Sequence, residues 1–364
     1  MTISTTQKAL LLHAQSTPYV LGESPVCRPG PEEVLVKIMA CALNPIDHAI
    51  VDPPYTQLFV NHWPFIAGYD GSGIVIEVGS QVNNLKEGDK VLFLGDGTNA
   101  QRSSTFQQYA VVPAELTAII PDNITFEQAA TLPLALTTDV LVLYNQSLTA
   151  ENISLRLKPV WEPEGVTAYA GTPAFIIGGA SSLGQYAIQL AKLAGHNPIV
   201  TTASPHNAPL LISLGATQVI DRHKSNESVL AELSTIAGGK AVEFAFVAIP
   251  HDPEMCRLGR DALAPGGALA VVLPSSRAIP EDVANPGDGK RLGFVYGSPY
   301  LPYTREAGVA MYKQITGWLQ KGILKPNPVE VLPNGLAGIP EGLERMKANK
   351  ISGKKLVALP QETP

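Results

Sequence analysis

The chain has 364 residues, more than a single hydrophobic core usually holds, so its length predicts two domains. Hydrophobic residues make up 45%, which excludes disorder for most of the chain, and the 32 glycines and 31 prolines follow no three-residue period, which excludes collagen. The formal net charge of −6 leaves no basic surface that could neutralise nucleic-acid phosphates, so we expect no nucleic-acid partner.

The cysteines and the N-terminus give no sign of an oxidising or membrane environment. Cys27, Cys41 and Cys256 are odd in number and none forms a CxxC pair, so no disulfide framework is predicted. No apolar run approaches the ~20 residues of a transmembrane helix, and residues 1–6 contain no basic segment typical of a signal peptide. We therefore expect a cytoplasmic protein without a membrane partner.

Short β-like runs broken by Gly, Pro and Asn predict a β-rich domain over the first 125 residues, with strands at 34–40, 73–79 and 90–94. From residue 126 the pattern changes. Helical segments are expected at 126–130 and 139–144, and from Ala174 strands alternate with helices through about six strands. This alternation is typical of a parallel sheet built from βαβ units, which binds ligands at the carboxyl ends of its strands.

Two further stretches define the predicted domain organisation. Residues 145–172 have no clear period, and so long a loop is either functional, mobile or an insertion without a role. After residue 299 the chain continues with a helix at 306–320 and a second helix that ends near Lys350. The run 355–359 is expected to be a strand that rejoins the first sheet. The predicted domains are therefore 1–125 with 300–364, and 126–299.

A turn rich in glycine and serine follows the apolar strand that begins at Ala174. Its residues are Gly178, Gly179, Ala180, Ser181, Ser182, Leu183 and Gly184. The helical pattern 186–194 comes next, so backbone N–H groups at a helix start lie where a pyrophosphate can bind. The turn is not a strict GxGxxG, and taken alone it fits an ordinary tight turn equally well.

The next strand, 197–203, bears on the choice between NADPH and NADH. An NAD site places an acidic residue near the end of this strand to bind the ribose 2′-OH, yet none occurs between Gln185 and Asp221. The polar residues that follow this strand and the next are Ser204, His206, Asn207, Arg222 and Lys224. Because hydroxyl, imidazole, amide and cationic groups suit a 2′-phosphate, the sequence predicts NADPH. The alternative is that 204–207 is merely a turn.

Ordered motifs along nearly the whole chain resemble the medium-chain dehydrogenase/reductases. The motifs are ALNPID at 42–47, GYDGSGIVIEVG at 68–79, EGDKV at 87–91, FQQYA at 106–110, Leu132-Pro133 with Thr138, and the turn at 178–184. The resemblance implies an α/β fold: a doubly wound parallel Rossmann sheet and a β-rich, GroES-like catalytic domain, with a cleft between them.

Asn44 and Tyr69 stand where the zinc-dependent branch of that family has Cys and His. Neither an amide nor a phenol replaces a thiolate or an imidazole as a zinc ligand, and the cysteine cluster of a structural zinc lobe is missing, so no metal site is expected. Alcohol dehydrogenation needs that Lewis acid. The expected chemistry is instead hydride transfer from a nicotinamide to a C=C bond that a conjugated carbonyl or thioester activates.

Within the zinc-free branch, segments 145–172, 204–207 and 351–357 look most like the fungal trans-acting enoyl reductases that partner polyketide synthases. The expected cofactor contacts are Ile46, Asp47, His48, Ala49, Gly178 to Gly184, Ser204, His206, Asn207, Arg222, Ile249, Ile351 and Ser352. Ala49 departs from the pattern, since the group has a member with Lys at this position. The implied reaction is NADPH-dependent reduction of a small or carrier-bound α,β-unsaturated thioester or ketone.

The catalytic residues expected from the resemblance are Tyr69, Asn44, Thr138 and His48. Tyr69 is either the proton donor to the substrate α-carbon or part of the cleft wall with solvent as the donor, and His48 and Tyr55 are the other polar candidates. Two other functions stay open. One is a quinone or small-enone reductase, and the other is a protein without redox activity that keeps the cofactor site as a scaffold.

Overall fold

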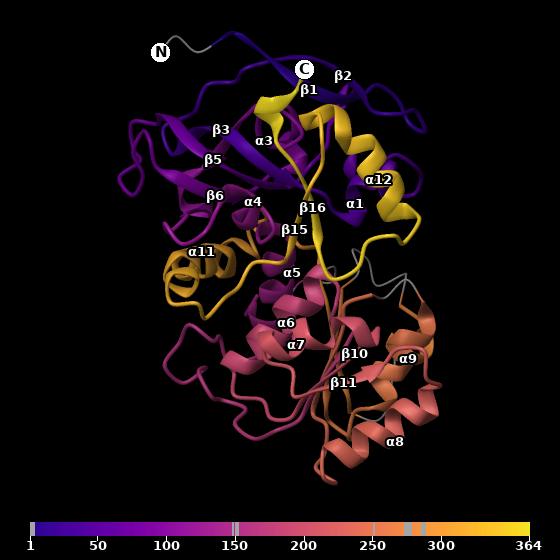
Figure 1. Cartoon of the computed structure of the whole chain (residues 1–364). Coiled ribbons are helices and arrows are strands. Elements are labelled where there is room, and N and C mark those ends of the chain that lie inside the picture. The colour runs from indigo at the N-terminus through magenta and orange to yellow at the C-terminus, as the bar shows by residue number, and fades with distance from the viewer. Residues whose placement is uncertain (1–3, 148, 150–152, 250–251, 273–278, 285–288) are drawn as a thin grey trace. The chain divides into compact units, whose positions relative to one another are not determined.

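The computed structural model describes residues 4–147, 149, 153–249, 252–272, 279–284 and 289–364, which form two compact units (Figure 1). The first unit comprises Met1–Leu134, Ile315–Gly322 and Pro326–Pro364, and the second comprises Ala135–Gln314 and Ile323–Lys325. Residues 126–134 thus group with the first unit and residues 300–314 with the second, whereas the domain boundaries predicted above at 125/126 and 299/300 stay predictions.

The first unit is built mainly on antiparallel strands, with one parallel pair, β15 and β16. Its strands are β1 (Thr6–Leu12), β2 (Val20–Pro25), β3 (Glu33–Ala42), β4 (Phe65–Ile66), β5 (Asp70–Val78), β6 (Lys90–Leu94), β7 (Tyr109–Pro113), β8 (Thr117–Ile119), β15 (Val329–Val331) and β16 (Lys355–Ala358). A seven-stranded sheet has the order β15-β16-β3-β5-β6-β8 with β7 also paired to β3, and a smaller sheet has the order β2-β1-β4. The strands predicted at 34–40, 73–79 and 90–94 are confirmed as β3, β5 and β6.

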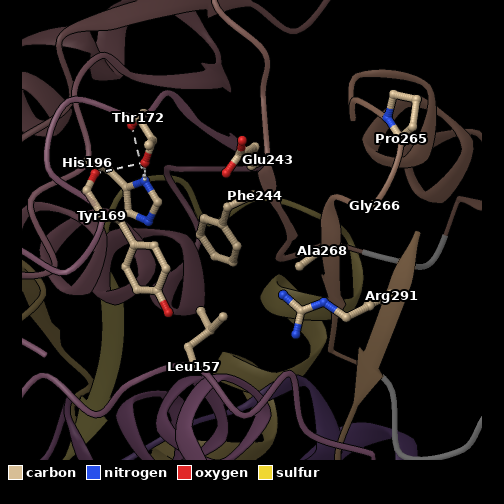
Figure 2. Close-up of a pocket in the computed structure, with 10 residues that line it drawn as sticks. All are labelled: Leu157, Tyr169, Thr172, His196, Glu243, Phe244, Pro265, Gly266, Ala268 and Arg291. Carbon is tan, nitrogen blue, oxygen red and sulfur yellow. Dashed lines mark hydrogen bonds between the residues drawn. The ribbon is translucent and has the colours of Figure 1, made fainter. Parts of the chain in front are cut away.

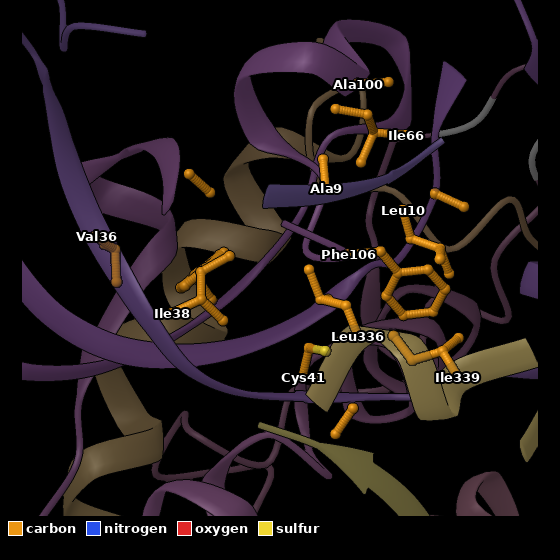
Figure 3. Close-up of a cluster of buried hydrophobic side chains, with 14 of the residues drawn as sticks. Ala9, Leu10, Val36, Ile38, Cys41, Ile66, Ala100, Phe106, Leu336 and Ile339 are labelled. Carbon is orange, nitrogen blue, oxygen red and sulfur yellow. The ribbon is translucent and has the colours of Figure 1, made fainter. Parts of the chain in front are cut away.

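The C-terminal strand returns to the first unit, as the sequence predicts. β16 pairs antiparallel with β3 in the register Val357↔Ala42, so the C-terminal strand joins the sheet formed by residues 33–119 (Figure 1). Leu336 and Ile339 pack with Phe106 and Leu10 in the core of this unit (Figure 3). Each fully buried side chain of this size contributes about 1.5–3 kcal/mol through removal of apolar surface from water, which accounts for the return of the C-terminal segment.

Short helices surround the first sheet and connect it to the rest of the chain. They are α1 (Pro45–Ala49), α2 (Tyr55–Phe59), α3 (Ala100–Ser103), α4 (Phe126–Ala129) and α12 (Ile339–Lys347). Thr125 caps α4 by accepting a hydrogen bond from the N–H of Gln128, which explains why the helix begins there. α5 (Pro133–Tyr144) and α11 (Arg305–Gln320) have residues in both units.

The second unit is a six-stranded parallel sheet with helical connections. Its strands are β9 (Ala174–Ile177), β10 (Ile199–Ala203), β11 (Gln218–Asp221), β12 (Phe244–Val247), β13 (Ala268–Val271) and β14 (Arg291–Phe294), and its helices are α6 (Ser182–Leu193), α7 (Ala208–Leu214), α8 (Asn226–Ile236), α9 (Pro253–Asp261) and α10 (Glu281–Ala284). The sheet order β11-β10-β9-β12-β13-β14 is the Rossmann order 3-2-1-4-5-6 when β9 is taken as the first strand. The predicted doubly wound sheet is confirmed.

The stretch 145–172 contains no helix and no named strand among its described residues, and one isolated bridge joins Ile153 to Phe294. Its described residues therefore belong to the second unit as an irregular segment before β9, as the absence of a sequence period indicates. Within the described ranges, no helix is both long and apolar enough to cross a membrane.

Candidate active site

The turn after β9 is closed by contacts that only glycine permits. Gly178 has φ +84°, in the left-handed region. A Cβ on Gly179 would lie 2.1 Å from Oγ1 of Thr201, and a Cβ on Gly184 would lie 2.3 Å from the carbonyl oxygen of Gly178. The close approach of β9, β10 and α6 therefore requires glycine at these positions.

Ser181 fixes the start of α6 at this turn. Its Oγ accepts a hydrogen bond from the N–H of Gly184 at 3.0 Å and donates one to the carbonyl oxygen of Gly178 at 2.8 Å. The backbone N–H groups at the start of this 12-residue helix carry partial positive charge. A small-residue turn that opens such a helix at the carboxyl end of a strand fits a pyrophosphate.

The same turn lies where the strand order of the sheet reverses. β9 pairs with β10 on one side and with β12 on the other. A Cβ on Gly178 would lie 2.7 Å from Cγ1 of Ile249, so the predicted contact residues Gly178 and Ile249 lie together at this position. Open α/β sheets bind ligands at such a reversal of strand order.

The ends of β10 and β11 bring two of the predicted phosphate-binding residues together. Nε of Arg222 donates a hydrogen bond to Oγ of Ser204 at 2.9 Å, although 18 residues separate them in sequence. The parallel pairing of Ala203 with Asp221 produces this contact, because Ser204 and Arg222 each follow directly. The predicted residue His206 is exposed beside them and Asn207 is buried.

Lys224, the other cation predicted near this position, is engaged elsewhere. Its Nζ lies 2.5 Å from Oε2 of Glu232 on α8. The guanidinium of Arg222 is thus the cation that the structure places against Ser204.

Asn44, Asp70 and Lys355 form a buried polar group in the first unit. Nζ of Lys355 lies 2.5 Å from Oδ2 of Asp70 and 3.0 Å from Oδ1 of Asn44, and Nδ2 of Asn44 donates to Oδ2 of Asp70 at 2.8 Å. The three residues are 5%, 0% and 4% exposed, respectively. A buried charge is tolerated when it is paired and hydrogen-bonded, and this pair meets both conditions.

The same group is tied to the start of α5 and to Thr131 just before it. Oδ1 of Asp70 accepts a hydrogen bond from the N–H of Leu134 at 2.6 Å, and Nζ of Lys355 lies 3.4 Å from the carbonyl oxygen of Thr131. The starts of β5, β16 and α5 and the residue before α1 therefore meet at one carboxylate.

Tyr69 directly precedes Asp70 and is 7% exposed. A Cβ on Gly97 would lie 2.9 Å from the phenol oxygen, so the Gly97 backbone packs against the ring. The turn at Gly68 has φ +90°, and a Cβ there would lie 2.4 Å from Cδ1 of Phe106. The Gly97 backbone thus packs against the Tyr69 ring, and the residue before Tyr69 packs closely on Phe106.

The predicted contact residues 46–49 form the short helix α1. Ile46, His48 and Ala49 are half-buried, whereas Asp47 is fully buried. Oδ2 of Asp47 accepts a hydrogen bond from the N–H of Asn44 at 2.7 Å, and the hydroxyl of Tyr19 donates to the Asp47 carbonyl oxygen at 2.7 Å. The Asp47 side chain therefore holds the start of α1.

Burial gives this part of the first unit unusual acid–base properties. The pKa of Asp47 is raised to about 8: loss of hydration is the largest cause and the Asp70 charge adds to it, while backbone N–H groups and Lys355 lower it. Burial also raises the pKa values of the Tyr19 phenol and the Cys41 thiol. A carboxyl group with such a pKa is protonated over much of the neutral range.

Thr138 lies on α5 in the second unit and is 5% exposed. A Cβ on Gly297 would lie 2.2 Å from Oγ1 of Thr138, so the Gly297 backbone packs on the hydroxyl. Its neighbour Asp139 is fully buried, burial raises the pKa of its carboxyl well above the usual value, and neither oxygen has a partner within the described part of the chain. Asn44, His48 and Tyr69, the other predicted catalytic residues, belong to the first unit.

Ile351 and Ser352 lie in the loop between α12 and β16. Ile351 is half-buried against the core of the first unit and Ser352 is exposed. The loop leads directly to Lys355. These two predicted contact residues thus lie a few residues before Lys355, a member of the buried polar group described above.

A hollow of about 250 Å³ lies at the opposite edge of the parallel sheet from the glycine turn (Figure 2). Phe244, Ala268 and Arg291, which line it, are the first residues of β12, β13 and β14. His196 stacks between Tyr169 and Phe244, with ring centroids 5.1 and 5.3 Å away (Figure 2). Because dinucleotides bind at the carboxyl edge, this hollow is not the predicted cofactor site.

Comparison with known proteins agrees with this geometry. Residues 30–122 match the family model "Alcohol dehydrogenase GroES-like domain", and residues 182–285 match "Zinc-binding dehydrogenase". A trans-enoyl reductase of Gibberella fujikuroi is 30% identical, with 92% of this chain and 93% of that protein covered. The trans-enoyl reductase ccsC of Aspergillus clavatus is 32% identical, with 92% and 90% covered. The chain belongs to the medium-chain dehydrogenase/reductase family, among its trans-enoyl reductases.

The fold of the family is also found among solved structures. An alcohol dehydrogenase superfamily protein from Novosphingobium aromaticivorans superposes with a TM-score of 0.77 at 22% identity, covering 96% of this chain and 98% of that one. Enoyl reductases of the family are nicotinamide-dependent. The turn 178–184 fits that class of cofactor, because it combines a helix start with three positions that require glycine, an arrangement that suits a pyrophosphate.

The donor set in the first unit differs from that of the family's zinc enzymes. Asn44 offers an amide that Asp70 and Lys355 already bind, and Tyr69 offers a phenol packed on Gly97. In the described part of the chain, no three His, Cys, Asp or Glu side chains are grouped to hold a metal ion.

Sequence reasoning missed Lys355 and Asp70 as members of this site. Asp70 lies inside the GYDGSG motif, which drew attention to Tyr69, and Lys355 begins an otherwise apolar strand. The sequence signal that could have identified the site is a lysine at the start of a strand of the core, since a buried lysine charge needs an oppositely charged partner.

Proposed function

We propose that the protein is an NADPH-dependent enoyl reductase that saturates the C=C bond of an α,β-unsaturated thioester or ketone in polyketide metabolism. The trans-enoyl reductase relatives support the reaction class. Among the contacts of this chain, the hydrogen bond from Arg222 to Ser204 beside the glycine turn carries the proposal, because it prepares a cationic site for a 2′-phosphate.

The two units have separate roles in this proposal. Bound NADPH supplies the hydride for reduction. The turn 178–184 binds the pyrophosphate, and Ser204, His206 and Arg222 bind the 2′-phosphate, while residues 46–49 and 351–352 add contacts from the first unit. The candidate catalytic residues are Asn44, Tyr69 and His48 of the first unit and Thr138 of the second.

The reaction balances with one hydride and one proton. The hydride forms the new C–H bond at the β-carbon, the electron pair of the C=C bond moves toward the carbonyl as an enolate, and a proton then adds at the α-carbon. The conjugated carbonyl is the electron sink, so the reaction needs no metal. Tyr69 shapes the wall beside the α-carbon in this account, and solvent delivers the proton.

The substrate is a small or carrier-bound enoyl compound. A polyketide synthase is the partner that would deliver a carrier-bound enoyl thioester, and we keep a cytoplasmic location as part of the proposal. The protein is not expected to act on nucleic acid or at a membrane.

The test is a substrate panel. Purified protein is incubated with NADPH and, in parallel, with 2-enoyl thioesters, enones and quinones, and the loss of absorbance at the nicotinamide band is followed. Turnover of enoyl thioesters supports the proposal. Turnover of quinones with none of thioesters would instead make the protein a quinone reductase, and failure to bind NADPH would leave a scaffold role.

A further inference from the structure

The side-chain amide of Asn44 has one chemically defined orientation. Its Oδ1 lies 3.0 Å from Nζ of Lys355, an ammonium that only donates, and its Nδ2 lies 2.8 Å from Oδ2 of Asp70, a carboxylate that only accepts. The flipped amide would place N–H groups against the ammonium and the oxygen against the carboxylate. The ion pair between Lys355 and Asp70 therefore determines which way the amide faces.

Counting hydrogens leaves one donor of this amide unused. An asparagine amide carries two N–H bonds, and the contact with Asp70 accounts for one. In the part of the chain that the structure describes, no second acceptor contacts Nδ2 of Asn44. A donor that is 5% exposed and already oriented loses little entropy when it binds an acceptor on a ligand.

We propose that Lys355 and Asp70 are positioning residues, which orient the Asn44 amide so that its second N–H donates to the carbonyl oxygen of the enoyl substrate. The inference rests on the proposed function and adds to it the hydrogen-bond donor that stabilises the negative charge developing on the enolate oxygen. Hydride addition at the β-carbon moves an electron pair onto that oxygen, so a fixed donor there is bound more strongly in the transition state than in the ground state. Because the Lys355 ammonium binds the amide oxygen, it polarises the N–H toward donation.

The buried pair offers a way to separate positioning from simple stability. Loss of one partner leaves an uncompensated buried charge, which destabilises the fold by itself, whereas neutral replacement of both partners is tolerated in many proteins. The double variant Asp70→Asn with Lys355→Met keeps an acceptor for the Leu134 N–H and an unbranched side chain at position 355. It removes both charges that orient Asn44.

The experiment compares this double variant with Asn44→Ala, which removes the amide but keeps the ion pair. Both should lose about 10²-fold in kcat for a 2-enoyl thioester, with the Kd for NADPH within twofold of the wild type and, for the double variant, a melting temperature near that of the wild type. The matched control is Lys354→Met. The ammonium of Lys354 pairs at the surface with Glu330 at 2.5 Å, so its removal should leave kcat unchanged.

A second readout does not depend on turnover. In the ¹⁵N–¹H spectrum of the protein without cofactor, the Asn44 side-chain amide, assigned by its absence in Asn44→Ala, should give two well-separated, slowly exchanging resonances. In the double variant they should shift and exchange rapidly. Unchanged Asn44 resonances in the folded double variant, or kcat within threefold of the wild type in either variant, would overturn the inference. Absence of wild-type turnover on any enoyl compound would overturn the proposed function, and the resonances would still report whether the pair orients Asn44.

Discussion

Nε of Arg222 donates to the hydroxyl oxygen of Ser204 at 2.9 Å, across the carboxyl ends of two neighbouring parallel strands. The contact places a guanidinium beside a hydroxyl where the second strand of a dinucleotide-binding sheet ends. In an NADH site a carboxylate would stand near this position and would repel a 2′-phosphate.

Arg222→Ala should weaken NADPH binding by ~10- to 100-fold and leave NADH binding nearly unchanged, because a hydrogen bond to a charged group contributes ~1.5–3 kcal/mol. Fluorescence titration with the two cofactors measures both constants. The matched variant is Lys224→Ala, which should have a smaller effect because the Lys224 ammonium pairs with Glu232. Equal affinities of the wild type for NADPH and NADH would contradict the assignment.

Gly179→Ala should destabilise the second unit and abolish cofactor binding. The new Cβ would lie 2.1 Å from Oγ1 of Thr201, which donates to the Ile176 carbonyl oxygen, so β9 and β10 would have to separate at the turn. Overpacking of this kind costs about 1–3 kcal/mol. The control is Gly317→Ala on α11. A Cβ at this position meets nothing within 4 Å, so the substitution should stabilise the helix slightly. Denaturant unfolding of both variants tests the difference, and equal stabilities would contradict it.

The raised pKa of Asp47 predicts how the free energy of unfolding depends on pH. Its pKa is about 8 in the folded chain and about 4 in an unfolded one, so between these values the folded state binds more protons. Its contribution to the free energy of unfolding is therefore fully present below about pH 4 and is lost as pH rises toward 8. Asp47→Asn should flatten this fall, as chemical unfolding at a series of pH values would reveal. A variant with the same pH slope as the wild type would assign the effect to another group.

Tyr69→Phe should retain activity within threefold of the wild type. The phenol is packed on the Gly97 backbone, and phenylalanine keeps the ring that forms this wall. Steady-state kinetics with a 2-enoyl thioester decides the point. A fall in kcat of ~10²–10⁴-fold at unchanged NADPH affinity would instead identify Tyr69 as the general acid.

The sequence predicted those features that depend on local patterns. The alternation of strand and helix patterns predicted the parallel sheet, and the small residues 178–184 predicted its turn, because both features depend on residues that are consecutive in the sequence. Lys355 and Asp70 are 285 residues apart, and they meet because β3 pairs with β16 on one side and with β5 on the other. Asp47 was expected to contact the cofactor, but sequence does not report that its carboxyl group is fully buried against the N–H of Asn44.

The most direct measurement of the proposed reaction follows the hydride itself. The protein is supplied with NADPH that carries deuterium at the 4R or at the 4S position, together with a 2-enoyl thioester, and the product is analysed by NMR spectroscopy. The account predicts a saturated thioester with deuterium at the β-carbon from one of the two labelled forms and none from the other. Deuterium at the α-carbon, or NADPH consumption without deuterium in the product, would contradict it.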